Sequence, residues 1–519
     1  MPAMTMAHPR PLDPADHSSL VGRIGGIRGW RARLWALAGA VFYFLFSAYY
    51  AANGDPNADE GFYAYASYNA MHGKMPYRDF AYTQMPALPY LQGSIFELTG
   101  YGVRQQRWLN VCLGSAAVFV AITLWLDTGL SVAGCLVLIL AWSLCPSLVY
   151  HDTIGKTYAM AQLLLVLAGS ALLSGFSPIR QLVLFSICSV LAVGCRLTIA
   201  PAIMVMWICF AVAHHRRIGW LVLFGCPLIL TLILFGPFFR ESDNAFFWTW
   251  SYHQQSLVPF ARLKLLALSF ATFPAVGILG LGALVLALVR RTRLNSPAGW
   301  ILAAGIIGWT VSVGVTGVYT DYAVPVLPLL LLGAGCLYAQ TRSGPRQVLL
   351  GCSLVLGAAA LGWLRGEHYI TKGYLDSVDE TVAYLKKNSA TDDMILTPMP
   401  EIPLEAGRPI FPGLDLGKFA LTAEMDETTA NRRRILTADH LWQAVDRQEA
   451  TFVVLSNFRS WNFHWTIPSL RPVRYAHYQK WVDLLMARYD CVYISPSFLI
   501  FKRHDPANPR LAINLNPPG

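Results

Sequence analysis

The chain has 519 residues, of which 55% are hydrophobic and only 13% are charged. Soluble domains carry about 25% charged residues, so this composition excludes an ordinary cytosolic enzyme and is typical of a polytopic membrane protein. The net charge of +10 would suit a nucleic-acid binder among soluble proteins, but in a membrane protein such an excess marks cytoplasmic loops, and we expect no nucleic-acid partner.

A polar arm, residues 1–29, precedes the first long apolar run, which is too late and too long for a cleaved signal peptide and predicts a signal anchor. Ten further runs can each cross about 30 Å of hydrocarbon. The fold class is therefore mainly α: a polytopic membrane domain over residues 30–365 with about eleven transmembrane helices. The predicted spans are 34–50, 109–126, 131–150, 158–174, 181–195, 199–213, 218–238, 265–289, 298–318, 322–340 and 347–364.

Orientation follows from the basic residues between spans. The N-terminal arm, Arg180 and the basic stretches 214–217, 290–293 and 342–346 all fall on one side of the membrane, which the positive-inside rule makes cytoplasmic. The chain contains no Asn-x-Ser/Thr sequon, which favours a bacterial origin. We therefore predict a bacterial inner-membrane protein whose N-terminus is cytoplasmic and whose C-terminal domain is periplasmic.

From residue 366 to 519 the composition is that of a soluble domain, and we predict an extracytoplasmic α/β domain there. A capping box at 377–380 predicts a helix that runs to Lys387, with Val378, Val382 and Leu385 on one face. Strands are predicted at 394–397, 452–456, 491–495 and 499–502, with a helix at 478–488. The aromatic stretch 461–465 is interpreted as an amphipathic strand or loop packed on the membrane domain, or else as a contact with lipid or glycan. The Pro-rich loop 398–412 has no assigned role.

The first outer loop, residues 51–107, carries two adjacent carboxylates, Asp59 and Glu60, a few residues beyond the first span. At the membrane surface one can accept a proton from a nucleophile, while the other can hold a metal or sugar hydroxyls. The stretch 61–71 is predicted to be an interfacial amphipathic helix, and 89–98 a second one. The alternative is that the two carboxylates only cap a helix or begin a solvated loop.

Two further outer positions carry charge next to apolar spans. Asp152 and Lys156 lie in the short loop 151–157, where the lysine can reach a lipid phosphate or simply snorkel to the surface. Arg196 lies between two apolar stretches, where an arginine costs several kcal/mol unless it faces a partner or water. It suits a bidentate phosphate contact, and snorkelling to the headgroups is the alternative. The aromatic loop 239–262 is interpreted as a flap or an aromatic belt.

The order of these motifs resembles a known family. Asp-Glu is followed by a Tyr-rich helix, Gly-x-x-Pro-Tyr-x-Asp-Phe at 73–80, Tyr-x-Gln-x-Pro at 82–86 and Arg107-Trp108, and the stretches 194–201 and 322–328 also match. Together they resemble GT-C glycosyltransferases, in particular the bacterial protein O-mannosyltransferase-like group with the aminoarabinose and rhizobial galacturonosyl transferases. The resemblance implies transfer of a sugar, with inversion, from a polyprenyl-phosphate donor to a lipid, polysaccharide or protein acceptor on the outer face.

The resemblance also implies roles for single residues. Asp59 matches the catalytic base, with Glu60 as its partner and Asp152 as a second acidic residue. Lys156 and Arg196 are expected to bind the donor phosphate, and a divalent cation on the three carboxylates is left open. Further substrate contacts are expected from Tyr63, Tyr82, Gln84 and Arg107.

The chain departs from the family pattern at two places. Asp321 stands before Tyr322, where many relatives have a basic residue, and Thr83 and Gln84 occupy the place of a lysine seen in aminoarabinose transferases. Phosphate binding therefore depends more heavily on Lys156 and Arg196.

Two other classes of function remain open from the sequence. A transporter or lipid flippase would place its charges at the membrane midplane, often in repeated halves, whereas here they cluster at the outer ends of spans and no repeat is visible. A catalytically silent scaffold would keep the fold and use its C-terminal domain to recruit a partner.

Overall fold

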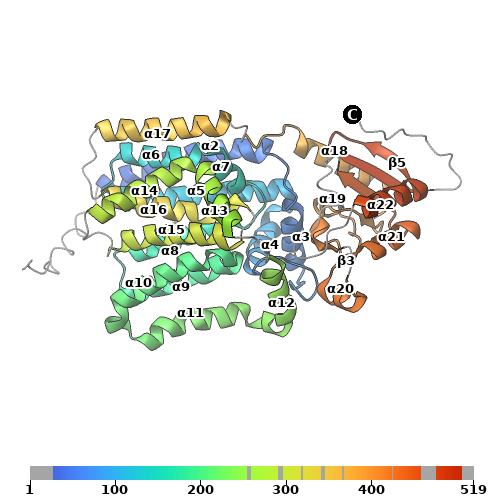
Figure 1. Ribbon diagram of the computed structural model, residues 1–519, viewed down its shortest axis with the longest axis horizontal. Coiled ribbons are helices and arrows are strands. Elements are labelled where there is room, and N and C mark those ends of the chain that lie inside the picture. The colour runs from blue at the N-terminus through green and yellow to red at the C-terminus, as the bar shows by residue number, and fades with distance from the viewer. Residues whose placement is uncertain are drawn as a thin grey trace, which may run out of the picture.

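The computed structural model describes residues 27–253, 259–289, 296–316, 319–339, 345–364, 368–422, 425–456 and 475–504. A bundle of long helices makes up one end of the molecule, and a smaller domain of helices and strands covers the other end (Figure 1). The predicted aromatic stretch 461–465 lies outside the described residues.

The bundle contains long apolar helices whose outward faces are apolar. Among the described residues, eight helices are long and apolar enough to cross a membrane, or up to ten if each of two bent pairs is one span, and Tyr158–Leu173 is a shorter apolar helix. Leu221 and Val289 are 90% and 76% exposed, as befits side chains that face lipid. The protein is an integral membrane protein. The straight helices are α2 (Ile27–Asn53), α5 (Val103–Asp127), α8 (Tyr158–Leu173), α9 (Pro178–Cys195), α10 (Ala200–Ile218), α11 (Trp220–Phe235), α15 (Pro297–Thr316), α16 (Leu327–Ala339) and α17 (Pro345–Leu364).

Two runs predicted as single spans are each a pair of helices joined at a bend. Helices α6 (Val132–Ser143) and α7 (Pro146–Thr153) meet at 69°, while α13 (Pro259–Thr272) and α14 (Pro274–Val289) meet at 98°. In both pairs a proline opens the second helix. Proline has no amide hydrogen to continue the first helix, but its fixed φ suits the first turn of a new one.

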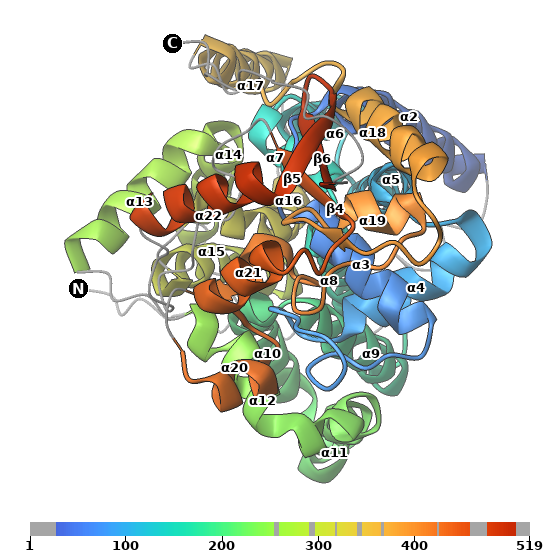
Figure 2. The same cartoon turned by 90° about the vertical axis from the view of Figure 1, so that its right-hand side faces the viewer.

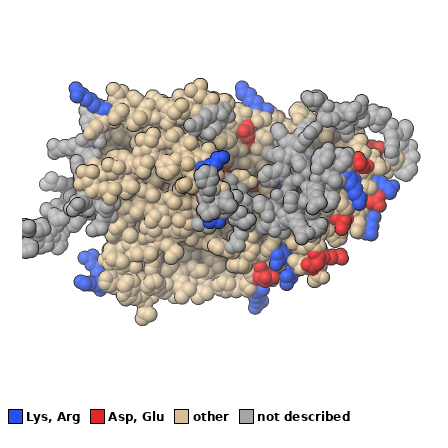
Figure 3. All heavy atoms as spheres, viewed as in Figure 1, with Lys and Arg blue, Asp and Glu red and all other residues tan. Residues whose placement is uncertain are grey.

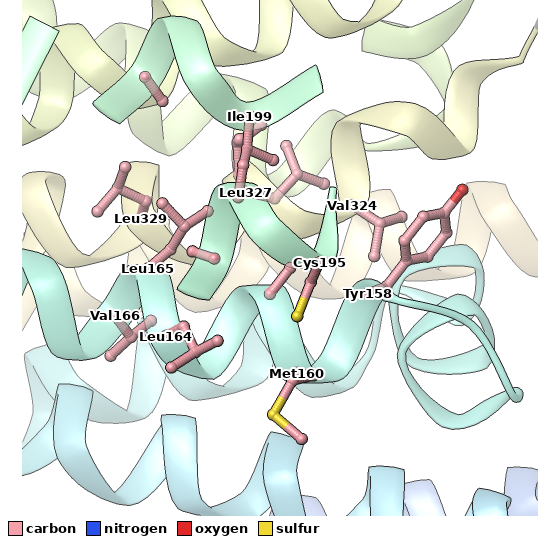
Figure 4. Packing of buried hydrophobic residues seen from close by; sticks show 14 of the residues in the cluster. Tyr158, Met160, Leu164, Leu165, Val166, Cys195, Ile199, Val324, Leu327 and Leu329 are labelled. Atoms are coloured by element: carbon pink, nitrogen blue, oxygen red, sulfur yellow. The ribbon is translucent and has the colours of Figure 1, made fainter. Parts of the chain in front are cut away.

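Close packing of small residues against leucines holds the middle of the bundle together. A Cβ added at Gly333 would lie 2.5 Å from the Leu302 amide nitrogen, and one added at Gly305 would lie 2.7 Å from Leu330 Cα, so α15 and α16 approach each other as only glycines allow. Figure 4 shows part of the same core, where Leu165 and Cys195 pack near Leu327.

Helices α3 (Glu60–Met71) and α4 (Ala87–Thr99) lie between the bundle and the outer domain. Both predicted helices are present, but the expectation that 61–71 lies in the membrane interface is wrong. Ten of the twelve residues of α3 are buried, because α4 packs on one side and α19 (Glu401–Ala406) of the outer domain on another. Its tyrosines therefore line an interior, with no broad face left for lipid.

The outer domain is built on a four-stranded sheet with the order β1-β4-β6-β5. Strand β1 runs parallel to β4, while β6 is antiparallel to both β4 and β5. Alternate residues of β4 face opposite sides, so Phe452 and Val454 pack with α18 while Val453 and Leu455 pack with α22 (Figure 2). The strands are β1 (Ile395–Leu396), β4 (Phe452–Ser456), β5 (Tyr489–Ile494) and β6 (Phe498–Arg503), and the two helices are α18 (Tyr374–Asn388) and α22 (Tyr475–Arg488).

The four strands and two helices appear where the sequence predicts them, within a few residues. The prediction of a capping box at 377–380 is wrong. Helix α18 begins at Tyr374, three residues before Ser377, and follows Gly373 at φ +81°. The Ser377 Oγ accepts a hydrogen bond from the Ser497 amide rather than from the start of the helix. The sequence did not predict a two-stranded parallel sheet, β2 (Leu421–Thr422) and β3 (Leu436–Thr437), nor α19, α20 (Glu427–Arg433) and α21 (Ala438–Asp446).

Candidate functional site

The charged residues of the outer loops meet at the end of the bundle that the outer domain covers. Lys156, in the turn between α7 and α8, lies between two carboxylates: its Nζ is 2.9 Å from Asp59 Oδ2 and 3.2 Å from Asp321 Oδ2. Asp59 immediately precedes α3, and Asp321 lies in the 3-10 helix η5 (Thr320–Val326) that opens α16. The Tyr158 hydroxyl donates to the same Asp321 oxygen at 2.8 Å.

Burial and charge act in opposite directions on Lys156. Burial by itself lowers the pKa of the ammonium, but the nearby carboxylates of Asp59 and Asp321 outweigh it and hold the pKa well above its ordinary value. The side chain of Asp59 is 27% exposed and is the more open end of this row, whereas that of Asp321 is 11% exposed. Of these two carboxylates, Asp59 is therefore the more accessible to a ligand.

Arg196 lies between the end of α9 and the short 3-10 helix η1 (Leu197–Ile199), and only 2% of the residue is exposed. Its guanidinium is sandwiched between the rings of Tyr158 and Tyr322, 4.6 Å and 4.5 Å from their centroids. Nε donates to Thr198 Oγ1 (3.0 Å) and Nη1 to Thr157 Oγ1 (3.2 Å). Nη2 is buried without a hydrogen-bond partner among the described residues. A buried donor on a fixed cation is a strong position for an anionic ligand.

Two of the predicted substrate contacts, Tyr63 and Tyr82, lie around this group. Burial raises the pKa of the Tyr63 hydroxyl, Arg196 and Lys156 act to lower it, and Asp59 acts to raise it further. Its ring meets that of Tyr82 edge-on, with centroids 6.1 Å apart.

The third predicted contact, Gln84, lies at the side of the group beside a histidine to which the sequence assigned no role. Gln84 Nε2 is 3.4 Å from His253 Nε2, and the same histidine nitrogen is 2.6 Å from the Thr83 carbonyl oxygen. These contacts tie the loop after α3 to the segment after α12 (Ser242–Thr249).

Glu60 and Arg107 are engaged with each other. Arg107 donates to both carboxylate oxygens of Glu60, at 2.7 Å and 2.6 Å, and both side chains are almost fully buried. Glu60 also accepts from the Gly155 amide (3.0 Å), so the pair fastens α3 and the turn before Lys156 to α5. This arrangement favours a structural role for Glu60 and Arg107, whereas the resemblance implied roles in catalysis and substrate binding.

Asp152 faces away from the row of charges. It accepts hydrogen bonds from the Tyr43 hydroxyl and from Gln162 Nε2 (3.0 Å), and it lies beside Gly114 in the interior of the bundle. Asp59, Glu60 and Asp152 thus each bind a different partner. Within the described part of the chain no three His, Cys, Asp or Glu residues are grouped to hold a metal ion, so these carboxylates do not fit the divalent cation that the sequence left open.

Sequence reasoning missed the part that four residues play in the site. Asp321 was noted only as a departure from the family pattern, although its pairing with Lys156 gives the change a physical meaning. Tyr158 had no signal beyond its aromatic character, and Tyr322 was noted only as part of the matching stretch 322–328; neither observation predicted that both rings lie against Arg196. Lys418, from the outer domain, is a further buried cation whose ammonium is affected by Asp59, and its sequence context gave no indication of this.

No protein-family profile and no curated protein matches the chain. Solved structures do match. ArnT from Cupriavidus metallidurans bound to undecaprenyl phosphate aligns over 92% of this chain and 98% of its own, with 14% identity and a TM-score of 0.60. The apo state of the same protein aligns over 91% and 97%, with 13% identity and a TM-score of 0.61. The mycobacterial arabinofuranosyltransferase AftD aligns over 92% of this chain but 40% of its own, with 13% identity and a TM-score of 0.50.

The chain is therefore an integral membrane protein with the fold of the GT-C glycosyltransferases, as the resemblance implied. At such low identity the likeness establishes the fold alone. Any statement about chemistry has to come from the residues gathered at the outer end of the bundle.

Proposed function

We propose that the protein transfers a sugar, with inversion, from a polyprenyl-phosphate-linked donor to an acceptor at the outer face of the membrane. The observation that carries the proposal is Arg196, whose buried Nη2 lacks a partner among the described residues. Its guanidinium and the Lys156 ammonium lie 4.6 Å and 5.4 Å from the centroid of the same Tyr158 ring, and Lys156 pairs with Asp59. This combination suits a phosphate that leaves beside a base. ArnT, with the same fold, was solved with undecaprenyl phosphate bound, which supports the choice of donor.

In the proposed reaction, Asp59 accepts the proton of an acceptor hydroxyl or amine as the acceptor atom attacks the anomeric carbon. The bond from that carbon to the phosphate oxygen breaks on the opposite side, and the electron pair leaves with the phosphate. One displacement inverts the anomeric configuration. The phosphate gains a negative charge in this step, so Lys156 and Arg196 stabilise the transition state more than the bound donor.

The position of Lys156 suggests how the base becomes available. Without donor, Lys156 is held by Asp59 and Asp321 together. A donor phosphate competes for the same ammonium, and Asp321 keeps the lysine in place while its contact with Asp59 loosens. The Asp59 carboxylate is then free to accept the acceptor proton.

The proposal includes the predicted orientation in a bacterial inner membrane, with the site periplasmic and the acceptor a lipid, a polysaccharide or a protein. Arg216 and Arg217 lie in the last turn of α10, at the end predicted to be cytoplasmic. In Figure 3 the visible charged side chains at the end away from the outer domain are basic, whereas the outer domain shows both acidic and basic side chains. This asymmetry agrees with the positive-inside rule.

The first test identifies the donor. Protein purified in mild detergent is compared with Arg196→Ala by mass spectrometry of the lipids that co-purify. We expect polyprenyl phosphate or its glycosylated form to be enriched with the wild type and lost from the variant. If both preparations hold only bulk phospholipid in equal amounts, Arg196 is not a phosphate-binding residue and the proposal loses its main support.

The second test concerns the base. With the donor identified by its sugar mass, transfer is assayed for Asp59→Asn and for Asp55→Asn, a matched control in the same loop whose carboxylate accepts from the Thr371 hydroxyl (2.6 Å). We expect Asp59→Asn to abolish transfer and still bind the donor, and Asp55→Asn to stay active. An active Asp59→Asn enzyme would refute the assignment of the base.

A further inference from the structure

A short helical segment continues the lipid-facing helix α11 toward the outer domain. It consists of the 3-10 helix η2 (Gly236–Glu241) and α12, which follow α11 directly along the chain. Leu232 and Ile233, in the last turn of α11, are large apolar side chains that remain exposed, as expected for a helix that faces lipid. The segment therefore begins where the chain leaves the hydrocarbon.

The exposed side of this segment is aromatic. Phe239, Phe246 and Trp250 are 59%, 61% and 44% exposed. The Trp250 amide donates to the Phe246 carbonyl at 3.0 Å, so these two residues lie one helical turn apart. Asn244 and Trp248 of the same helix are buried. Exposed aromatic rings directly beyond a span are typical of the membrane interface, which places α12 at the level of the lipid headgroups.

Helix α20 of the outer domain is bound to α12 at this level. The Asn244 Nδ2 donates to the Arg432 carbonyl oxygen at 2.9 Å and to the Tyr77 carbonyl oxygen at 3.2 Å. The guanidinium of Arg433 lies over the ring of Phe247, with its Cζ 3.9 Å from the ring centroid. Figure 1 and Figure 2 both show α12 and α20 side by side. The last turn of α20 therefore lies beside the membrane surface.

Three consecutive arginines occupy this end of α20: Arg432, Arg433 and Arg434, which we call the arginine cluster. Arg432 Nη1 lies 3.6 Å from Asp243 Oδ2, and both side chains of this pair are more than half exposed. Neither Arg433 nor Arg434 pairs with a carboxylate in the part of the chain that the structure describes. The Nε of Arg433 is buried and has no hydrogen-bond partner among the same residues. The cluster thus has donors that no anion of the described chain uses.

Charge is divided along α20. Its acidic residues, Asp426 at the N-cap and Glu427, lie at the start of the helix, whereas the arginine cluster lies at its end. Arg434 Nη2 donates to the carbonyl oxygen of Arg78 at 2.8 Å, and the Arg78 side chain is paired with Asp79. The end of α20 that meets α12 and the loop 76–84 is therefore basic.

The place of the cluster indicates which anion it can bind. Arginine presents a planar fork of N–H donors that matches a phosphate, and the phosphates at a membrane surface belong to lipid headgroups. Basic side chains near a membrane surface are attracted to anionic lipids. Two guanidinium groups without carboxylate partners, next to interfacial aromatic rings, fit the phosphodiester of an anionic phospholipid whose acyl chains lie against α11.

We propose that the arginine cluster and α12 together bind the headgroup of an anionic phospholipid, in the leaflet on the side of the outer domain. The inference goes beyond the proposed function, because this lipid is neither donor nor acceptor. The bound lipid seats the outer domain on the membrane surface. It also supports the loop beside the candidate site, because Asn244 joins Arg432 to Tyr77, and the Tyr77 hydroxyl donates to the Gln84 carbonyl oxygen.

The test measures lipid binding to the full chain, purified and delipidated in a neutral detergent. The probes are phosphatidylglycerol and phosphatidylcholine with the same acyl chains, so only the headgroup and its net charge differ. Bound lipid is counted by native mass spectrometry across a titration. We expect the wild type to prefer phosphatidylglycerol, and Arg433→Gln/Arg434→Gln to lose that preference by at least about ten-fold. The preference of the wild type should also weaken as salt is added.

The matched control, Arg447→Gln/Arg488→Gln, removes two exposed arginines of the outer domain that are paired with Glu449 and Asp446. This control should keep the full preference for phosphatidylglycerol. If it loses the preference as well, the charge of the whole outer domain attracts the lipid, and the inference is overturned.

A second variant guards against a folding defect, because Arg433 packs on Phe247. Arg432→Gln/Arg434→Gln leaves that contact in place and should also lose the preference, and the melting temperature of each variant is measured in the same detergent. The inference is overturned if the wild type binds both lipids equally, or if both variants of the cluster keep the preference. Sugar transfer is not part of this test, so its outcome is independent of the proposed function.

Discussion

The ion pair of Arg107 and Glu60 offers the sharpest separation of structure from chemistry. The Arg107→Leu variant removes two hydrogen bonds to Glu60 and three to the carbonyl oxygens of Ala51, Gly54 and Asp55, at 3.1 to 3.3 Å. It leaves a carboxylate with 2% exposure and no cation. Removal of one partner from a buried pair costs about 3–5 kcal/mol, so we expect a large loss of stability.

The matched control is Arg104→Leu, less than one turn earlier on α5. Arg104 also binds two carboxylates, those of Asp376 and Asp379 at 3.0 Å and 2.6 Å, but its side chain is 38% exposed. Exposed pairs contribute about 0–1 kcal/mol, so this variant should melt close to the wild type. The double variant Arg107→Leu/Glu60→Leu should recover part of the loss, because no unpaired charge remains.

Thermal melting of each variant is monitored by circular dichroism in the same detergent. Binding of undecaprenyl phosphate is then measured on the folded fraction. We expect Arg107→Leu to melt well below the control and to bind normally while folded. An Arg107→Leu protein that melts with the wild type but no longer binds the lipid would make Arg107 a substrate contact, as the family resemblance implied, and the structural interpretation would be wrong.

Three further outcomes follow from the site and its surroundings. Burial raises the pKa of Glu401 from 4.5 to about 8, so the folded protein keeps a proton that the unfolded chain loses, and stability should fall by about 1.4 kcal/mol per pH unit across this window. Glu401→Gln should have a higher melting temperature than the wild type at about pH 8 and the same melting temperature at about pH 5. The same difference in melting temperature at both pH values would contradict this. Lys156→Met should lower the melting temperature, because it leaves Asp59 and Asp321 without their shared cation. Adding Asp321→Asn to this variant should restore part of the loss. No recovery in the double variant would show that the two carboxylates do not share this lysine. Arg196→Lys keeps the charge but loses the planar stacking, so undecaprenyl phosphate binding should weaken about ten-fold, and unchanged binding would show that the aromatic sandwich is irrelevant.

The sequence was a good guide where a local pattern has one physical solution. Long apolar runs form helices that face lipid. A short apolar run such as 452–456 forms a strand that is buried on both faces, with Val453 on one face of the sheet and Val454 on the other. It was a poor guide where the outcome depends on what lies opposite. The stretch 61–71 has the composition of an interfacial helix, yet the outer domain covers it. The capping box predicted at 377–380 lies inside α18, because the helix begins at Tyr374 and the Ser377 hydroxyl hydrogen-bonds to Ser495 between β5 and β6.

For the site, the sequence by itself placed Asp59, Lys156 and Arg196 at outer ends of spans, because charge is tolerated there and is costly within hydrocarbon. Only the tertiary structure decided which charges meet. Lys156 pairs with Asp59 and Asp321, and Glu60 pairs with Arg107. Lys418 is affected by Asp59 although it lies more than two hundred residues further along the chain, in another domain. A buried charge must find its partner in space, and spacing along the chain carries no record of that partner.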